Sequence, residues 1–224
     1  MGKTSNYLMP LQDQMYAAAS KEIAKPMEKY MKHLFPYLGV KAPLRKTIYK
    51  AFIKNNLPSS SSWEAEIKYL WSLPEREFQY TAIELCWACR KMWTKKTIHL
   101  LVFLLKDKSW WDSVDAIASI LVGHYFLVFP EEKQATILKW SKDDNLWIRR
   151  TSIIFQLKYG AKTDWDLLQA CINNNLNSKE FFINKAIGWA LRQYARTNAE
   201  QVRDFVHHTQ LANLSKREAL KHIG

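Results

Sequence analysis

Apolar residues recur with a helical period along almost the whole chain, and this pattern constrains the fold more than any other feature. Ile183, Ile187, Ala190 and Tyr194, for example, are spaced four, three and four apart, so they share one helix face. The apolar run 100–105 is too short to predict a strand and lies within a helical pattern. Six Gly and seven Pro in 224 residues leave little turn material for an all-β fold. We therefore expect an all-α protein.

The helices are predicted to be short and to pair antiparallel through brief polar joints. Prolines at 26, 43 and 74 suit the first turn of a helix. This organisation indicates a HEAT-like α-solenoid with a concave binding face, forming one domain over 1–224, and a compact helical bundle is the alternative. Capping-box spacings occur at Ser61…Glu64, Ser72…Glu75, Thr197…Glu200 and Ser215…Glu218. The expected helices are 7–19, 26–35, 43–55, 62–72, 74–91, 94–106, 110–128, 131–141, 145–159, 164–175, 179–196, 199–208 and 215–222.

The charge balance indicates an anionic partner. Thirty-three Lys and Arg against 21 Asp and Glu give a net charge of +12, which favours nucleic acid first and an anionic membrane surface second. Ten Trp supply flat faces that serve sugar and base contacts as well as cores. A protein-interaction solenoid would favour a neutral or acidic groove, so the charge argues against that class.

Targeting signals are not apparent. Residues 1–14 contain no apolar core of a signal peptide, and no run of about 18 apolar residues predicts a membrane span. Three cysteines, an odd number, suit a reducing compartment. We expect a monomeric cytoplasmic protein that is not associated with a membrane.

Motifs for metals and nucleotide cofactors are missing. Cys86 and Cys89 form a lone CxxC within a helical pattern, which we interpret as one apolar helix turn. The six histidines show no HxxxH or HExxH spacing, and no GxGxxG, P-loop or GxSxG occurs. We therefore expect no metal and no cofactor.

The segment 109–115 (Ser-Trp-Trp-Asp-Ser-Val-Asp) combines two indoles with two carboxylates. Ser109 and Asp112 have the spacing of an N-cap and its N3 partner, which predicts a helix start. In that helix Trp111 and Asp115 are four residues apart and project from one face. From these residues alone, a buried Trp beside a solvated Asp is as plausible as a catalytic pair.

A second segment, 178–197, places a tryptophan in a basic stripe. Lys185, Trp189, Arg192 and Arg196 are spaced four, three and four apart. Cations for phosphates and an indole for a base or sugar would make a nucleic-acid face. The alternative is a Trp at the edge of the core with solvated cations around it.

Further cations could bind phosphates. Arg150 and Lys158 lie about two turns apart on the expected helix 145–159, although each could equally be ordinary surface charge. Lys216 and Arg217 follow Ser215 at the expected start of the last helix, where backbone N–H groups could hold a phosphate. A plain N-cap with solvated charges is the alternative there.

Trp111, Asp115 and Trp189 amid cations suit the cleavage of a bond whose leaving group is already charged. An N3- or N7-alkylated purine carries a positive charge and departs neutral, so the usual general acid of glycoside cleavage is not required. Indole faces attract cations, and one carboxylate can stabilise an oxocarbenium ion and orient water.

Several segments resemble the AlkD-type DNA alkylation repair glycosylases. The resemblance extends from about Pro26 to Ile223, with Pro43 in place. The matching segments are 30–39 (Tyr-Met-Lys-His-Leu-Phe-Pro-Tyr-Leu-Gly), 73–78 (Leu-Pro-Glu-Arg-Glu-Phe), 109–115, 155–159 (Phe-Gln-Leu-Lys-Tyr), 178–195 and 214–219 (Leu-Ser-Lys-Arg-Glu-Ala).

The resemblance implies a HEAT-like solenoid that holds duplex DNA in a basic concave groove and excises 3-methyladenine and 7-methylguanine without base flipping. It implies catalytic roles for Trp111, Asp115 and Trp189. The DNA contacts that it implies are Tyr30, Arg150, Lys158, Lys185 and Arg192. Because the site offers no desolvated lysine amine, we expect a monofunctional hydrolase. The alternative is a non-catalytic module that binds damaged or distorted DNA.

Overall fold

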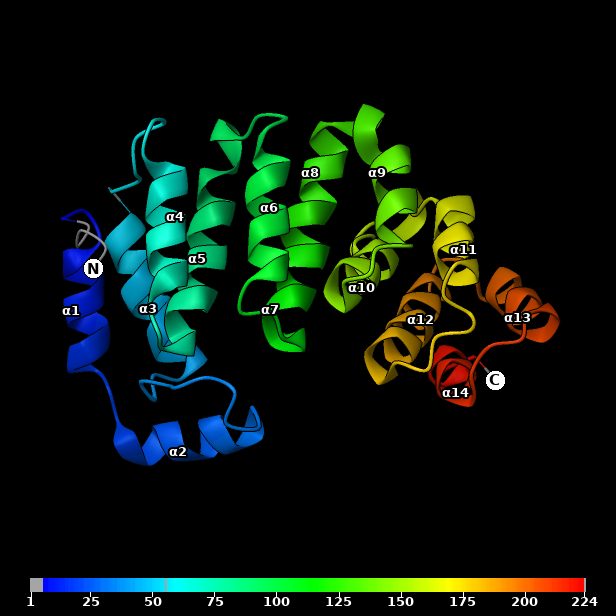
Figure 1. Cartoon of the computed structure of the whole chain (residues 1–224), viewed down its shortest axis with the longest axis horizontal. Helices are drawn as coiled ribbons and strands as arrows, with labels where there is room; N and C mark the ends of the chain where they lie inside the picture. Colours follow the sequence, from blue (N-terminus) through cyan, green and yellow to red (C-terminus); the bar gives the residue numbers. More distant parts are fainter. Residues whose placement is uncertain (1–5, 55, 224) are drawn as a thin grey trace. The chain divides into compact units, whose positions relative to one another are not determined.

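The computed structural model describes residues 6–54 and 56–223, and within them it contains helices and no strand (Figure 1). The chain forms two compact units, Met1–Thr94 and Lys95–Gly224. The expected single domain over 1–224 and the concave groove both stay predictions.

Within its described residues, 6–54 and 56–94, the first unit contains five α-helices and a short 3-10 turn. Helices α4 and α5 pack side by side, as Figure 1 shows. The elements are α1 (Met9–Ala17), α2 (Lys21–Tyr30), α3 (Ala42–Ile53), α4 (Trp63–Ser72), α5 (Arg76–Ala88) and the 3-10 turn Cys89–Met92.

The second unit holds the segments that the sequence selected as functional. Its helix expected at 110–128 runs without interruption but widens into a π-helical turn directly after Ala116. The elements are α6 (Thr97–Lys106), α7 (Trp111–Ala116), the π turn Ile117–Val122, α8 (Gly123–Val128), α9 (Lys133–Trp140), α10 (Leu146–Ile154), α11 (Trp165–Asn173), α12 (Phe181–Tyr194), α13 (Ala199–His208) and α14 (Asn213–Leu220), with 3-10 turns at Pro130–Glu132 and Gly160–Lys162.

Side-chain caps begin several helices, though often not at the expected residue. Asn145 accepts from the amides of Trp147 and Ile148 at the start of α10. Asp164 and Asn198 cap α11 and α13 in the same way. Each side chain satisfies an amide that has no partner within its helix.

Other start signals were wrong. Pro26 lies inside α2, which begins one turn earlier behind the Ser20 cap. Ser72 ends α4, and Ser109 donates to the Leu105 carbonyl at 2.6 Å, so neither caps the helix that follows. Ser215 is buried within α14 and donates to the Asn184 carbonyl at 2.8 Å. A hydroxyl near a helix end bonds to whichever group the packing brings close, so spacing alone does not decide a cap.

A buried carboxylate fixes the segment after α2 in the first unit. Glu77 of α5 accepts from the amides of Leu38, Gly39 and Val40 at 2.9–3.0 Å. Burial raises the pKa of Glu77, while these three hydrogen bonds oppose the rise. Gly39 has φ of +84°, a left-handed conformation that favours glycine. The clamp therefore sets the path of the chain just beyond Tyr30.

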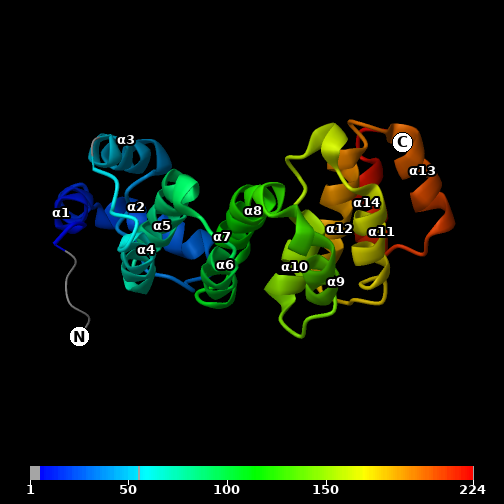
Figure 2. The same ribbon diagram turned by 90° about the horizontal axis from the view of Figure 1, so that it is seen from above.

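In the second unit, α12 and α14 are packed closely (Figures 1 and 2). At Gly188 the two helices approach closely: a Cβ there would lie 2.4 Å from the Glu218 Cβ. Glycine therefore lets the two backbones approach at a distance that any side chain would prevent.

The three cysteines are buried and unpaired with one another. Burial raises the pKa of Cys89 to about 11 and that of Cys171 to about 12. Within 6–54 and 56–223, no three His, Cys, Asp or Glu side chains are grouped so that they could hold a metal ion. No single helix there is long and apolar enough to cross a membrane; Trp111–Val128 and Pro130–Trp140 pass that test only jointly, with a bend of 108° between them.

Candidate nucleic-acid interface and active site

An aromatic cluster forms the base of the candidate site. The Trp110 ring packs edge-on against Trp147 of α10 at 5.6 Å and Phe182 of α12 at 5.2 Å between centroids. Trp147 and Phe182 contact each other at 5.1 Å. Such aromatic pairs add about 0.5–1.5 kcal/mol each beyond area burial. Trp110 thus belongs to packing and holds the start of α7 against α10 and α12.

Asp115 lies one turn beyond Trp111 on α7 and is held by Arg150. The guanidinium binds the carboxylate through two bonds, Nε to Oδ1 at 2.7 Å and Nη2 to Oδ2 at 2.9 Å. The Arg150 side chain is only 3% exposed, whereas Asp115 is 18% exposed. This bidentate pair fixes the carboxylate plane and leaves part of it open to solvent.

The environment of Asp115 opposes its charge. Burial raises the pKa of Asp115, and the hydrogen bonds and charge of Arg150 act against that rise. Asp112, on the same helix, contributes a further small increase. A carboxylate with little water and one fixed cation interacts strongly with positive charge that develops nearby.

Arg150 also connects this pair to the helix that carries Trp189. Its Nη1 donates to the carbonyl of Phe182, so one guanidinium links α7, α10 and α12. Trp189 lies seven residues after Phe182, two turns along the same face and roughly 10 Å along the axis. Both Trp111 and Trp189 are half-buried.

Glu218, which the sequence pattern placed only in a capping box, binds the two cations beside Trp189. Glu218 of α14 accepts from Lys185 Nζ and Arg192 Nη1. The bond from Lys185, at 2.7 Å, is the main cause of a lowered pKa for Glu218. DNA contacts by Lys185 and Arg192 stay predictions, but neither cation is isolated in the folded chain.

Arg150 lies within the fold, and its expected contact with DNA stays a prediction. Because the buried guanidinium is occupied by Asp115 and Phe182, Arg150 supports the carboxylate from within the fold. The prediction that Arg150 and Lys158 share one helix was wrong, since α10 ends at Ile154. Lys158 is exposed in the turns beyond it, and its phosphate contact stays a prediction.

The remaining predicted contacts lie elsewhere. Tyr30 ends α2 in the first unit and is 70% exposed. Lys216 and Arg217 are exposed on α14, which begins at Asn213. The Lys216 amide bonds to the Ala212 carbonyl at 3.0 Å within the helix. The idea that this amide helps to hold a phosphate at a helix start is therefore wrong.

Arg149 has a structural bond that the sequence did not reveal. Its Nη1 donates to the carbonyls of Asp143 at 2.7 Å and Asp144 at 3.1 Å. It braces the loop before α10, whereas its neighbour Arg150 points to Asp115.

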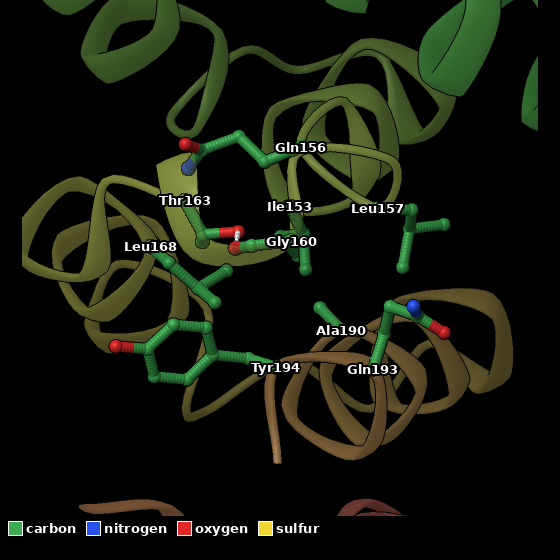
Figure 3. Close-up of a pocket in the computed structure, with 9 residues that line it drawn as sticks. All are labelled: Ile153, Gln156, Leu157, Gly160, Thr163, Leu168, Ala190, Gln193 and Tyr194. Atoms are coloured by element: carbon green, nitrogen blue, oxygen red, sulfur yellow. Dashed lines mark hydrogen bonds between the residues drawn. The ribbon is translucent and has the colours of Figure 1, made fainter. Parts of the chain in front are cut away.

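A small hollow lies between α10, α11 and α12. Figure 3 shows Ala190 and Tyr194 of α12 on one side and Ile153 of α10 and Leu168 of α11 on the other. Its volume of about 10 Å³ suits one water molecule, not a purine. The rest of its lining is Gln156, Leu157, Gly160, Thr163 and Gln193. Trp111, Asp115 and Trp189 are not part of this lining.

Comparisons with known proteins point to one family. The family described as DNA alkylation repair enzyme matches residues 11–223. A solved structure described as a predicted DNA alkylation repair enzyme from Enterococcus faecalis is 32% identical, with a TM-score of 0.86 over 92% of this chain and 97% of that one. No curated protein matches. The structural likeness confirms the all-α class, and a solenoid of helices is consistent with it. The chain belongs to the DNA alkylation repair enzyme family.

Proposed function

We propose that this protein is a monofunctional DNA glycosylase that hydrolyses the N-glycosidic bond of cationic alkylated purines, 3-methyladenine and 7-methylguanine among them. The observation that carries the proposal is the Asp115 carboxylate, fixed by a buried Arg150 and still partly open to solvent. Family membership supports a role in the repair of alkylated DNA.

The chemistry matches what this site offers. The alkylated base already carries a positive charge, so the bond to the sugar can break with both electrons leaving on the base, which departs neutral. The sugar becomes an oxocarbenium-like cation, and water adds to its anomeric carbon and loses a proton to solvent. Asp115 would stabilise that cation and orient the water, while the indoles of Trp111 and Trp189 attract positive charge through their faces.

The geometry also favours hydrolysis over a lyase reaction. A Schiff-base mechanism needs a neutral lysine amine near the sugar. Lys185 is the lysine of α12 in the stripe of Trp189, and its ammonium is bound to Glu218 at 2.7 Å. An ion-paired ammonium is not a nucleophile, so water, and not Lys185, attacks the anomeric carbon of the sugar.

The proposed substrate is double-stranded DNA, bound by a monomer in the cytoplasm near the nucleoid. The net charge of +12 supports an electrostatic grip on the phosphates. The proposed excision does not draw the base into a pocket.

The experiment is a product analysis with duplex DNA that carries 7-methylguanine. The wild-type protein should release free 7-methylguanine and leave an abasic site in an unbroken strand. Strand cleavage without added alkali would contradict the monofunctional mechanism. Tight binding without any release would favour the non-catalytic alternative.

A further inference from the structure

Glu218 lies between two cations on the face of α12 that carries Trp189. Its carboxylate binds Lys185 Nζ at 2.7 Å through one oxygen and Arg192 Nη1 at 2.5 Å through the other. Glu218 is 12% exposed, whereas Lys185 is 39% and Arg192 is 23% exposed. The carboxylate is therefore the inner member of the triad, and the cations are its outer members.

The triad is aligned with the candidate site. Lys185 precedes Trp189 by four residues and Arg192 follows it by three, so the two cations flank the indole at roughly 6 Å and 4.5 Å along the helix axis. The close approach at Gly188 fixes the part of α14 that carries Glu218. The position of Glu218 is thus set by backbone packing.

The triad also sets the charge that this face offers. Two cations and one carboxylate leave a net charge of +1, and a phosphate must compete with Glu218 for both cations. Arg192 also borders an open hollow of about 410 Å³, whose lining includes Arg196, so its guanidinium has room to meet a phosphate if released.

We infer that Glu218 is a positioning residue: it holds Lys185 and Arg192 at fixed places on either side of Trp189, and it limits the attraction of this face for undamaged DNA. The inference rests on the proposed function. The inference predicts two opposite effects. Loss of the carboxylate should strengthen non-specific DNA binding and should also slow base release. A residue with a merely structural role would weaken both when replaced.

The test is Glu218→Gln, measured on undamaged duplex and on 7-methylguanine duplex. Affinity for undamaged duplex at 50 mM salt should increase on the order of fivefold, and the slope of log affinity against log salt should steepen by up to about 0.9 for each cation released to a phosphate. Base release under single-turnover conditions should slow on the order of tenfold. The matched control is Glu200→Gln, an exposed position on α13 with the same change of charge, which should alter neither quantity appreciably.

Unchanged or weaker binding of undamaged duplex by Glu218→Gln would overturn the inference, and so would tighter binding with release at the wild-type rate. If the wild type released no base, the proposed function would fail, and the binding comparison alone would decide this inference. Should Glu218→Gln not fold, Glu218→Asp decides: the charge remains but the shorter side chain cannot reach both cations. We expect the salt slope to steepen by at most about 0.9, for the one cation released, with slower base release, and release at the wild-type rate would overturn the inference.

Discussion

Replacing Arg150 with Met should destabilise the protein by about 3 kcal/mol, because it leaves the Asp115 carboxylate without its cation. Removing one member of a buried ion pair costs about 3–5 kcal/mol. The lower end applies because Asp115 is 18% exposed and water can partly replace the guanidinium. The loss of the hydrogen bond to the Phe182 carbonyl is included in that figure. For a chain of this length the melting temperature should fall by about 6–12 °C.

The destabilisation should depend on pH in a defined direction. Burial raises the pKa of Asp115 and Arg150 opposes this rise, so in Arg150→Met the pKa of Asp115 rises further. A carboxyl group with a folded-state pKa above its unfolded value favours the folded state when protonated, and that contribution is lost as the pH rises through the folded pKa. The loss of unfolding free energy in Arg150→Met should therefore become smaller as the pH is lowered.

The assay is urea unfolding of a double-mutant cycle, with hydrogen exchange of α7, α10 and α12 to locate the loss. Asp115→Asn in the Arg150→Met background removes the unpaired charge and should recover about 2 kcal/mol. Arg149→Met is the matched control, since Arg149 binds only backbone carbonyls in the contacts described above and should cost about 1 kcal/mol without pH dependence. If the losses in unfolding free energy of the two single variants, Arg150→Met and Asp115→Asn, add up to that of the double variant within about 0.5 kcal/mol, the reasoning is refuted.

Three further predictions follow from the same structure. Because burial raises the pKa of Asp115, base release should decline on the acid side at a pH above the ordinary aspartate pKa of about 3.9, as a pH–rate profile would show. Gly188→Ala should lower stability by about 1–3 kcal/mol in urea unfolding, since its Cβ would lie 2.4 Å from the Glu218 Cβ; an unchanged midpoint would contradict this contact. Glu77→Gln should lose protection against hydrogen exchange at the amides of residues 38–40, which donate hydrogen bonds to the Glu77 carboxylate. Retained protection would argue against the clamp.

Local patterns predicted the helices because periodicity and the helix are both local. The helix that carries Trp111 and Asp115 was predicted from the Ser109…Asp112 spacing, although Ser109 does not cap it, and α12 was predicted from its apolar stripe. The wide turn Ile117–Val122 gave no signal, because a π turn preserves the apolar character of its residues and changes only the hydrogen-bond register.

Pairings between distant residues could not be predicted. Arg150 meets Asp115 across 35 residues, and Glu218 meets Lys185 across 33. A basic residue on a helix has the same sequence signature whether it projects to solvent or binds a carboxylate on another helix. The sequence therefore selected residues for the candidate site but did not reveal that Arg150 binds Asp115.

The most direct test of the account compares the wild type with Asp115→Asn on 7-methylguanine duplex under single-turnover conditions, with DNA affinity measured in parallel. The account predicts that Asp115→Asn binds the duplex with wild-type affinity within a fewfold and releases base at least about a hundredfold more slowly, because the carboxylate acts on charge that develops only in the transition state. Base release by Asp115→Asn at the wild-type rate would contradict it.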